Sequence, residues 1–424
     1  MRPFNYNWSK MLNKVIIIGA GAAGLMAAAA AISNNCEVVI YDGNEKVGKK
    51  IYITGKGRCN LTNACDISEY FDNIVSNDKF LYSALYSFTN DDVIAFFNDN
   101  GCPIKVERGN RAFPRSDKSS DIIKTLERYL KSKGVKIVLN TKVKSIVTSN
   151  GKACGVNLEN GRVDSCDSVI LATGGMSYPA TGSTGDGYRF AKELDIKVTP
   201  LRPSLVPLEA KEVYISNLQG LSLRNVELKI YRDDKVIYSD FGEMLFTHFG
   251  VSGPLVLSAS SVIGSVLEKG IELKASIDLK SALSYKKLED RIIRDIDNNK
   301  NKEIKFLLSS LLPNKMVGCF LDMLNVDEHL KLNEFTKEMR SHLLELLKAF
   351  PFTITKLRGF KEAIITQGGI DVSEINPSTM ESKKVKGLYF AGEIIDIDAL
   401  TGGFNLQLAF STGHLAGLSA SDHN

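Results

Sequence analysis

Three glycines and one acid near the start of the chain have the types and spacing of a dinucleotide-binding site. Gly19, Gly21 and Gly24 form a G-x-G-x-x-G pattern, and Asp42 follows the first of them by 23 residues (42 − 19). In a strand–turn–helix unit, such glycines make a tight turn and let the backbone approach a pyrophosphate, while the acid meets the ribose hydroxyls. The free N–H groups at the helix start attract the phosphates. The pattern therefore predicts a bound dinucleotide.

Two strands and a helix are expected around this pattern. An apolar run at 15–18 predicts a buried parallel strand, alanine-rich residues 25–32 predict a helix, and 37–41 predict a second strand. The apolar stretch 15–32 also resembles a membrane span or a signal peptide. Three glycines within its first ten residues, and no polar spacer after it, argue against both interpretations. Dinucleotide binding is therefore favoured.

A second stretch rich in glycine and cations follows at residues 48–60. Its N–H groups and positive charge suit phosphates or an electron-rich ring. By itself such a stretch predicts a mobile surface loop, but its place directly after the nucleotide unit favours a binding role. Cys59 within it suggests redox chemistry. Because no C-x-x-C partner accompanies it, a small residue that fits the backbone is the alternative.

Composition narrows the class of protein. The chain has 424 residues, of which 44% are hydrophobic and 24% charged, as in ordinary globular domains. The net charge of +4 (53 − 49) is too small and too dispersed to predict nucleic acid or an anionic membrane as a partner. Seven scattered cysteines and five scattered histidines fit neither a disulfide framework nor a metal site. A cytoplasmic protein with a small-molecule substrate is expected, and its oligomeric state is left open.

The order of helices and strands in the first half indicates an α/β domain. The spacing predicts a loop at 109–116 and a helix at 120–132. Three strands are then expected at 135–139, 143–148 and 153–158, with hairpin turns at the Asn-Gly pairs 150–151 and 160–161. Another buried strand, 168–172, ends in a Thr-Gly-Gly sequence.

The second half changes in texture from about Leu201. Alternating residues at 226–230 and 271–279 predict half-buried antiparallel strands, and the period from 285 to 350 is helical. Between the strands, His248 lies in a segment rich in glycine and aromatic residues. It either faces a substrate or is structural. Near the carboxyl terminus, Gly402 and Gly403 are expected to open a helix that runs to about Ser421.

Four stretches together carry a family resemblance. They are the amino-terminal glycine unit, the I-T-G-K-G-R-C-N sequence at 53–60, the A-T-G-G sequence at 172–175, and A-G-E at 391–393 with G-G-F-N at 402–405. In this combination the chain resembles the BaiN/RdsA-type bacterial FAD-dependent oxidoreductases, distant relatives of glutathione-reductase and fumarate-reductase flavoproteins. Residues 246–254 resemble that family as well. The resemblance implies FAD and an α/β fold with a glutathione-reductase-like Rossmann domain.

The domain organisation expected from these observations is discontinuous. Residues 12–200 and 351–424 form the FAD-binding Rossmann-type domain. Residues 201–280 form an inserted antiparallel β domain for the substrate, and 281–350 form a helical subdomain.

The resemblance also implies roles for individual residues. Gly19, Gly21 and Gly24 lie against the pyrophosphate, and Asp42 binds the adenosine ribose. Asn405 and Leu406 place amides near the flavin pyrimidine ring, where donors stabilise the anionic reduced flavin. The other implied cofactor-binding residues are Ala23, Lys50, Gly55, Gly57, Arg58, Cys59, Asn60, Val143, Thr173, Gly174, Gly392, Glu393 and Gly403.

One departure concerns the electron donor. No second G-x-G-x-x-G follows a strand, and the glycines at 182, 185 and 187 have the wrong spacing. A separate nicotinamide domain of the glutathione-reductase type is therefore not expected. NAD(P)H, if it is the reductant, must dock transiently near the flavin.

Three functions remain open at this point. The first is NAD(P)H-driven reduction of a C=C bond in a steroid-like or bile-acid-like enone, with hydride passing from flavin N5 to the β-carbon. Tyr178 and His248 are the candidate proton donors for it. The second is an oxidase of a small amino-ketone that uses oxygen, and the third is a flavin-bound RNA-associated or regulatory protein. An apolar pocket would favour the enone, a small polar pocket the amine, and a basic patch the RNA.

Overall fold

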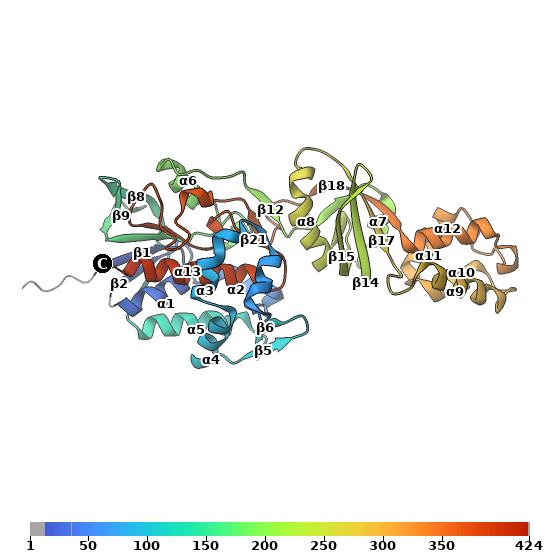
Figure 1. Ribbon diagram of the computed structural model, residues 1–424, viewed down its shortest axis with the longest axis horizontal. Helices are drawn as coiled ribbons and strands as arrows, with labels where there is room; N and C mark the ends of the chain where they lie inside the picture. Colours follow the sequence, from blue (N-terminus) through green and yellow to red (C-terminus); the bar gives the residue numbers. More distant parts are fainter. Residues whose placement is uncertain (1–12, 35, 423–424) are drawn as a thin grey trace, which may run out of the picture. The chain divides into compact units, whose positions relative to one another are not determined.

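The computed structural model describes residues 13–34 and 36–422 and divides into two compact units (Figure 1). The α/β unit takes in the chain up to Pro203 and again from Ala363, and the inserted unit is Ser204–Glu362. The predicted start of the fold at residue 12 lies outside the described residues.

A five-stranded parallel sheet forms the centre of the α/β unit, in the order β20-β11-β1-β2-β7. The residues of β1 from Val15 to Ile18 are at most 5% exposed, because an all-apolar strand requires cover on both faces. This confirms the predicted Rossmann-type class. The bounds are Lys14–Ile18 (β1), Glu37–Tyr41 (β2), Lys136–Val138 (β7), Ser168–Leu171 (β11) and Leu388–Phe390 (β20).

Two helices from opposite ends of the chain pack against each other beside this sheet. They are α1 (Ala22–Ala31) and α13 (Phe404–Ser421). A Cβ on Gly413 would lie 2.3 Å from the carbonyl oxygen of Ala23, and one on Gly417 would lie 2.2 Å from that of Ala27. Only glycine permits so close an approach of the two backbones. The contact brings the carboxyl-terminal segment alongside the first helix.

Three small antiparallel sheets lie in the described part of this unit, and a further sheet pairs β12 (Arg202–Ser204) with β19 (Ile365–Gln367). Both predicted Asn-Gly hairpins are found, joining β8 (Val143–Ser149), β9 (Lys152–Leu158) and β10 (Val163–Ser165). The loop expected at 109–116 is wrong: β6 (Arg111–Pro114) pairs with β5 (Ile104–Glu107) and β3 (Thr62–Asn63). Burial of Ala112 and Phe113 makes a strand of this short segment. The third sheet pairs β4 (Ile74–Ser76) with β21 (Asp398–Ala399).

Short helices replace the loop expected at 48–60. Helix α2 (Lys49–Ile53) and a 3₁₀ turn (Thr54–Gly57) occupy most of it. Helix α5 (Ser119–Ser132) agrees closely with the predicted helix at 120–132 and packs on α2. The loop after β11 leads into α6 (Asp186–Glu193).

The inserted unit is a closed six-stranded antiparallel barrel with helices. The strand order is β13-β16-β15-β14-β17-β18. Strand β18 closes the barrel by pairing with β13 and β17. Residues 351–357 therefore belong to this unit, and the expectation that they belong to the FAD-binding domain is wrong. The bounds are Leu208–Ala210 (β13), Ser222–Arg232 (β14), Lys235–Phe246 (β15), Gly250–Ser252 (β16), Leu273–Asp278 (β17) and Phe350–Leu357 (β18).

Helices α9 to α12 lie where the helical period from 285 to 350 predicts them, whereas α8 was not predicted. In α9 the residues Leu288, Ile292 and Ile296 are buried at i, i+4 and i+8, the spacing of one helix face. Their burial joins the helices to the barrel core in one apolar cluster. The helices are α8 (Pro254–Leu267), α9 (Tyr285–Asp297), α10 (Ile304–Leu311), α11 (Asn314–Leu324) and α12 (Lys337–Lys348).

Candidate cofactor site

The glycine loop between β1 and α1 has the geometry that dinucleotide binding requires. Gly19 has φ +110°, and a Cβ there would lie 2.4 Å from the carbonyl oxygen of Ala172. A Cβ on Gly24 would lie 1.9 Å from the carbonyl oxygen of Gly19. Gly21 differs from both, because a Cβ there would meet no atom within 4 Å. Two of the glycines therefore serve the turn and its packing, and Gly21 borders open space.

The residues around this open space fit FAD. Helix α1 starts after Gly21 with no side-chain cap and no acid in its first turn, so its positive end is not neutralised locally. In the described part of the chain, Asn60 Oδ1 and Thr173 Oγ1 are buried without a hydrogen-bond partner. Buried polar atoms normally have partners. A ligand with phosphates and hydroxyls can supply them.

Asp42 lies at the end of β2, where the sequence placed it. One carboxylate oxygen accepts the backbone N–H of Ala20 at 2.7 Å, and the other accepts the backbone N–H of Asn44 at 2.7 Å and its side-chain amide at 2.9 Å. The carboxylate thus holds the glycine loop in shape. A carboxylate oxygen has the capacity for more than one hydrogen bond, so the ribose role stays a prediction that this geometry permits.

A charged cluster joins three distant segments of the α/β unit. The ammonium of Lys50 lies 2.5 Å from Oε2 of Glu393 and donates to Oγ of Ser177 at 2.6 Å. Lys50 comes from α2, Glu393 follows β20, and Ser177 lies in the loop after β11. The side chains of Lys50 and Glu393 are 22% and 19% exposed, so solvent screens the pair only partly. We call these residues, with Thr366, the Lys50–Glu393 cluster.

Thr366 completes the cluster from β19 (Ile365–Gln367). Its N–H donates to Oε1 of Glu393 at 2.8 Å, and the same oxygen accepts the hydroxyl of Ser177 at 2.6 Å. The hydroxyl oxygen of Thr366 accepts two backbone N–H groups, from Met176 at 2.8 Å and from Ser177 at 3.0 Å. A Cβ on Gly175 would lie 2.4 Å from that oxygen. The sequence analysis did not select Ser177 or Thr366 as site residues. The available signal was Gly175, where a side chain would clash with the Thr366 hydroxyl.

Arg58 is engaged by its own chain. Its guanidinium lies 2.6 Å from Glu107 and 2.6 Å from Asp117, and stacks over the ring of Phe113 at 4.3 Å. Lys105 joins the same carboxylates. The side chain therefore anchors the β5–β6 hairpin, and its predicted contact with the cofactor stays a prediction.

The Cys59 thiol is placed for packing and not for redox chemistry. It is 0% exposed, and burial raises the pKa of the thiol to about 12. Reactivity requires the thiolate. We expect Cys59→Ala to leave the rates of flavin reduction and reoxidation within twofold of the parent. We also expect Cys59 to resist alkylation at pH 8 in the native protein, as read by peptide mass spectrometry. Rapid alkylation, or loss of turnover in the alanine variant, would contradict this.

The start of α13 lies nine residues before the point where this helix meets the start of α1, because Gly413 packs on Ala23. It follows Gly403, which has φ +101°, and has no side-chain cap and no acid in its first turn. The Asn405 side chain accepts the N–H of Ala399 at 3.0 Å and donates to its carbonyl at 2.6 Å, which ties the helix start to β21. The backbone N–H groups of this first turn are the predicted flavin donors.

The other predicted cofactor residues surround these elements. A Cβ on Gly392 would lie 2.7 Å from Cβ of Ala23, which places the end of β20 against α1. Val143 is buried at the start of β8, and Leu406 is half-buried in α13. The 54–60 turn has left-handed backbone at Gly55, Gly57 and Cys59, and Gly174 has φ +72°.

The two candidate proton donors fall in different units. Tyr178 is half-buried, has φ +51°, and directly follows Ser177 of the Lys50–Glu393 cluster. His248 is exposed in the inserted unit, with its ring edge-on to Phe249 at 4.9 Å. Their catalytic roles stay predictions.

Asp398 is a buried acid that sequence reasoning did not select. It is 1% exposed, and Oδ2 accepts the amide of Gln367 at 3.0 Å. Burial raises the pKa of its carboxyl to about 6, and the neighbouring Asp396 adds to the shift.

This pKa predicts a pH-dependent stability. An unfolded aspartate has a pKa near 4, so between about pH 4 and pH 6 the folded protein binds more protons than the unfolded chain. The stability from Asp398 is fully present below pH 4 and is lost as the pH rises through 6. The free energy of unfolding of Asp398→Asn, measured relative to that of the parent, is expected to rise by about 2 kcal/mol as the pH rises from 4 to 7. Urea unfolding across this range measures the difference, and Asp72→Asn, at an exposed carboxylate, is the control. A difference that does not vary with pH would contradict it.

Within residues 13–34 and 36–422, no three His, Cys, Asp or Glu side chains gather as a metal site would require. Among the helices of this part of the chain, none combines the length and apolarity of a bilayer span.

Sequence comparisons match this chain almost from end to end. The family described as HI0933-like protein Rossmann domain matches residues 13–419. The 3-dehydro-bile acid delta(4,6)-reductase of Clostridium scindens is 31% identical over 97% of this chain and 100% of its own. The ribosomal RNA dihydrouridine synthase of Haemophilus influenzae is 32% identical over 96% of this chain and 98% of its own. An Escherichia coli protein of the same name is 31% identical over 94% of this chain and 95% of its own.

Solved structures agree in fold. The 3-ketosteroid delta1-dehydrogenase of Sterolibacterium denitrificans has a TM-score of 0.54 at 12% identity, covering 96% of this chain and 99% of its own. A quinol-fumarate reductase has a TM-score of 0.50 at 17% identity, covering 96% and 70%. The family resemblance predicted from the motifs is thus confirmed. The chain belongs to the HI0933-like protein Rossmann-domain family and is an FAD-dependent oxidoreductase.

Proposed function

We propose that the protein reduces a carbon–carbon double bond conjugated to a carbonyl group, with NAD(P)H as the electron donor. The observation that carries this proposal is the end-to-end match to an enzyme whose name states the reduction of delta-4,6 double bonds in a 3-dehydro bile acid. A dihydrouridine synthase also saturates a ring double bond next to a carbonyl. Relatives with different substrates therefore share one reaction type, and that reaction type is the proposed function.

The residues of the site have separate tasks in this reaction. The glycine loop and the start of α1 hold the pyrophosphate, and Asp42 holds the ribose. The uncapped start of α13 supplies N–H donors that stabilise negative charge. Burial raises the pKa of the Cys59 thiol to about 12, which disfavours its thiolate form. FAD, when bound, supplies two-electron transfer between a nicotinamide and the double bond.

Two substrates fit this chemistry. A steroid-like enone is the first, in line with the bile-acid reductase relative. The second is uridine in ribosomal RNA, favoured by two relatives at 32% and 31% identity. An RNA substrate differs from the expectation that nucleic acid is not a partner, and that expectation rested on net charge alone.

Anaerobic stopped-flow spectroscopy tests the proposal. The flavin band of the purified holoprotein is followed with NADH or NADPH, and the reduced protein is then mixed with a 3-oxo-delta-4 steroid, an unmodified ribosomal RNA fragment, or air. We expect reduction by one nucleotide, slow reoxidation by air, and fast reoxidation by the steroid or the RNA. Absence of reduction by both nucleotides, together with rapid turnover of aminoacetone in air, would replace the proposal by the amino-ketone oxidase.

A further inference from the structure

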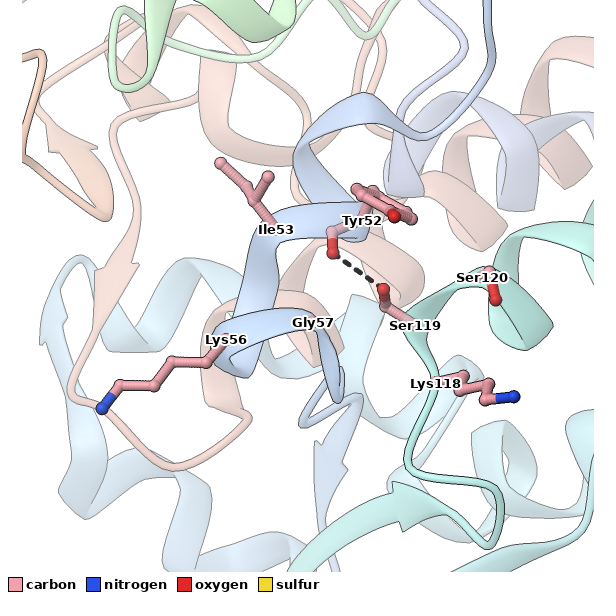
Figure 2. Close-up of a pocket in the computed structure, with 7 residues that line it drawn as sticks. All are labelled: Tyr52, Ile53, Lys56, Gly57, Lys118, Ser119 and Ser120. Atoms are coloured by element: carbon pink, nitrogen blue, oxygen red, sulfur yellow. Dashed lines mark hydrogen bonds between the residues drawn. The ribbon is translucent and has the colours of Figure 1, made fainter.

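A hollow of about 510 Å³ lies on the α/β unit beside helix α2 (Figure 2). Tyr52 and Ile53 of this helix, Lys56 and Gly57 of the following turn, and Lys118 to Ser120 at the start of α5 line it. Two segments that are about sixty residues apart in sequence therefore make one site. The side chains that line the hollow have no role in the cofactor site described above. Only the backbone of the 54–57 turn, which includes Lys56 and Gly57, belongs to both.

The charge of this hollow is positive. Lys56 and Lys118 are exposed lining residues, and no Asp or Glu is among the residues that line it. In the described ranges, neither ammonium makes an ion pair, whereas the neighbouring Asp117 is held by Arg58 and Lys105. Asp121 follows in the first turn of α5 but does not line the hollow. Two unneutralised cations beside one hollow favour a ligand with phosphate groups. Their ammonium groups point to opposite sides in Figure 2, so a ligand that contacts both must extend across the hollow or draw the lysine side chains toward it.

The hollow also has an apolar wall. Tyr52 is 60% exposed and Ile53 is 40% exposed, which is unusual for large apolar side chains placed next to each other on one short helix. The Ser119 hydroxyl donates to the carbonyl oxygen of Tyr52 at 2.7 Å, and this hydrogen bond joins the two segments that line the hollow (Figure 2). An exposed aromatic ring provides a stacking surface for a purine base.

Helix α2 gives this hollow a defined place relative to the cofactor site. Lys50, two residues before Tyr52, points its ammonium to Glu393 and Ser177. Tyr52 and Ile53 are exposed on the same five-residue helix and line the hollow instead. A ligand bound there contacts the element that carries a residue of the Lys50–Glu393 cluster without displacing that cluster.

We propose that this hollow binds the adenosine-phosphate half of NAD(P)H, with phosphate groups on Lys56 and Lys118 and adenine on the ring of Tyr52. The inference rests on the proposed function, which needs a nicotinamide donor but has no second dinucleotide-binding glycine motif to hold it. It assigns to this chain a donor site made of side chains on α2 and α5.

The holoprotein with its full content of FAD is the material for the test. ADP and 2′,5′-ADP are titrated by calorimetry, and steady-state constants are measured for NADH and NADPH. Lys56→Gln, Lys118→Gln and the double variant are compared with Lys124→Gln, which changes an exposed lysine of α5 outside the hollow. We expect the double variant to raise KM for the nucleotide about tenfold, with kcat, FAD content and reoxidation of dithionite-reduced protein unchanged. The Lys124 control is expected to match the parent.

The remaining outcomes separate the site from the function. If the parent binds neither ADP nor 2′,5′-ADP, or if the double variant keeps the parental KM, the site is wrong. If the lysine variants weaken binding of a ribosomal RNA fragment but leave KM for the nucleotide unchanged, the hollow serves RNA phosphates and the inference is overturned. If NAD(P)H fails to reduce the parent although both ADP probes bind in a Lys56- and Lys118-dependent way, the proposed function fails while the nucleotide site stands.

Discussion

Replacing Gly21 with alanine is expected to weaken FAD binding roughly hundredfold while the free energy of unfolding of the apoprotein does not fall and rises by up to about 1 kcal/mol. Gly21 has φ −86° and ψ −169°, an extended conformation that alanine adopts without strain. The added Cβ would meet no atom of the described chain within 4 Å. The methyl group therefore interferes only with a ligand. Loss of one charge-assisted hydrogen bond to a pyrophosphate costs about 3 kcal/mol, which gives the factor quoted.

The measurement is a fluorescence titration of the apoprotein with FAD, paired with urea unfolding of the same sample. Gly318→Ala is the matched control, because a Cβ at this α11 position also meets nothing within 4 Å. It should leave FAD affinity unchanged and raise stability by about 0.5–1 kcal/mol, since alanine is favoured over glycine inside a helix. Gly24→Ala provides the contrast: its Cβ would lie 1.9 Å from the carbonyl oxygen of Gly19, so it should lose stability as well as FAD. Parental FAD affinity in Gly21→Ala would show that the pyrophosphate lies elsewhere.

The parts of the fold that sequence predicts well are those encoded locally. Strand β2 at Glu37–Tyr41 is found at the predicted residues, and α13 begins directly after the predicted Gly-Gly pair. The glycine loop belongs to the same class, because the spacing of Gly19, Gly21 and Gly24 alone specifies its turn. Each of these features depends on residues within about ten positions of one another.

The charged partners of the site could not be predicted in the same way. The family resemblance implies a cofactor role for Lys50, but it does not give the contacts of Lys50 with Ser177 and Glu393, which lie 127 and 343 residues away. Arg58, in the same stretch at 48–60, instead meets Glu107 at the end of β5 and Asp117 in the segment after β6. Which cation meets which carboxylate depends on the packing of whole strands. Charge spacing within one loop does not contain that information.

Barrel closure in the inserted unit has the same cause. The alternation at 271–279 predicts a strand but not its neighbours. Residues from 351 onward were expected to return to the FAD-binding domain, whereas residues 351–357 pair with β17 and β13. The β13–β18 pairing spans about 150 residues of sequence, and a strand with apolar alternation satisfies many partners equally well.

Removing the carboxylate of Glu393 is expected to cost about 3 kcal/mol of stability and to release FAD. Glu393→Ala leaves the Lys50 ammonium, which is only 22% exposed, without its counter-charge, and removes the acceptor for Ser177 and for the Thr366 N–H. Breaking a largely buried pair by deleting one partner costs about 3–5 kcal/mol, and partial exposure places this pair at the lower end. The loop that carries Thr173, Gly174 and Tyr178 loses its attachment to β19 and β20.

A double-mutant cycle separates the pair from the rest of the network. Glu393→Gln keeps an acceptor for Ser177 but removes the charge, and Lys50→Met removes the ammonium. We expect each single change to destabilise the protein and the double variant to be less destabilised than the sum, with a coupling energy of about 1–2 kcal/mol in urea unfolding. The exposed pair Lys131 and Glu127, four residues apart on α5, is the matched control and should couple by no more than about 0.5 kcal/mol.

The FAD content of the same variants decides what the cluster is for. If Lys50→Met and Glu393→Gln lose FAD in proportion to their loss of stability, the cluster acts by holding the loop after β11 in place. If the double variant regains stability but FAD is still lost wherever Lys50 is replaced by Met, the ammonium itself binds the cofactor, as the family resemblance implies for Lys50. Full FAD retention in Glu393→Ala would contradict both roles, because the loop and the cation would then be dispensable for the site that they join.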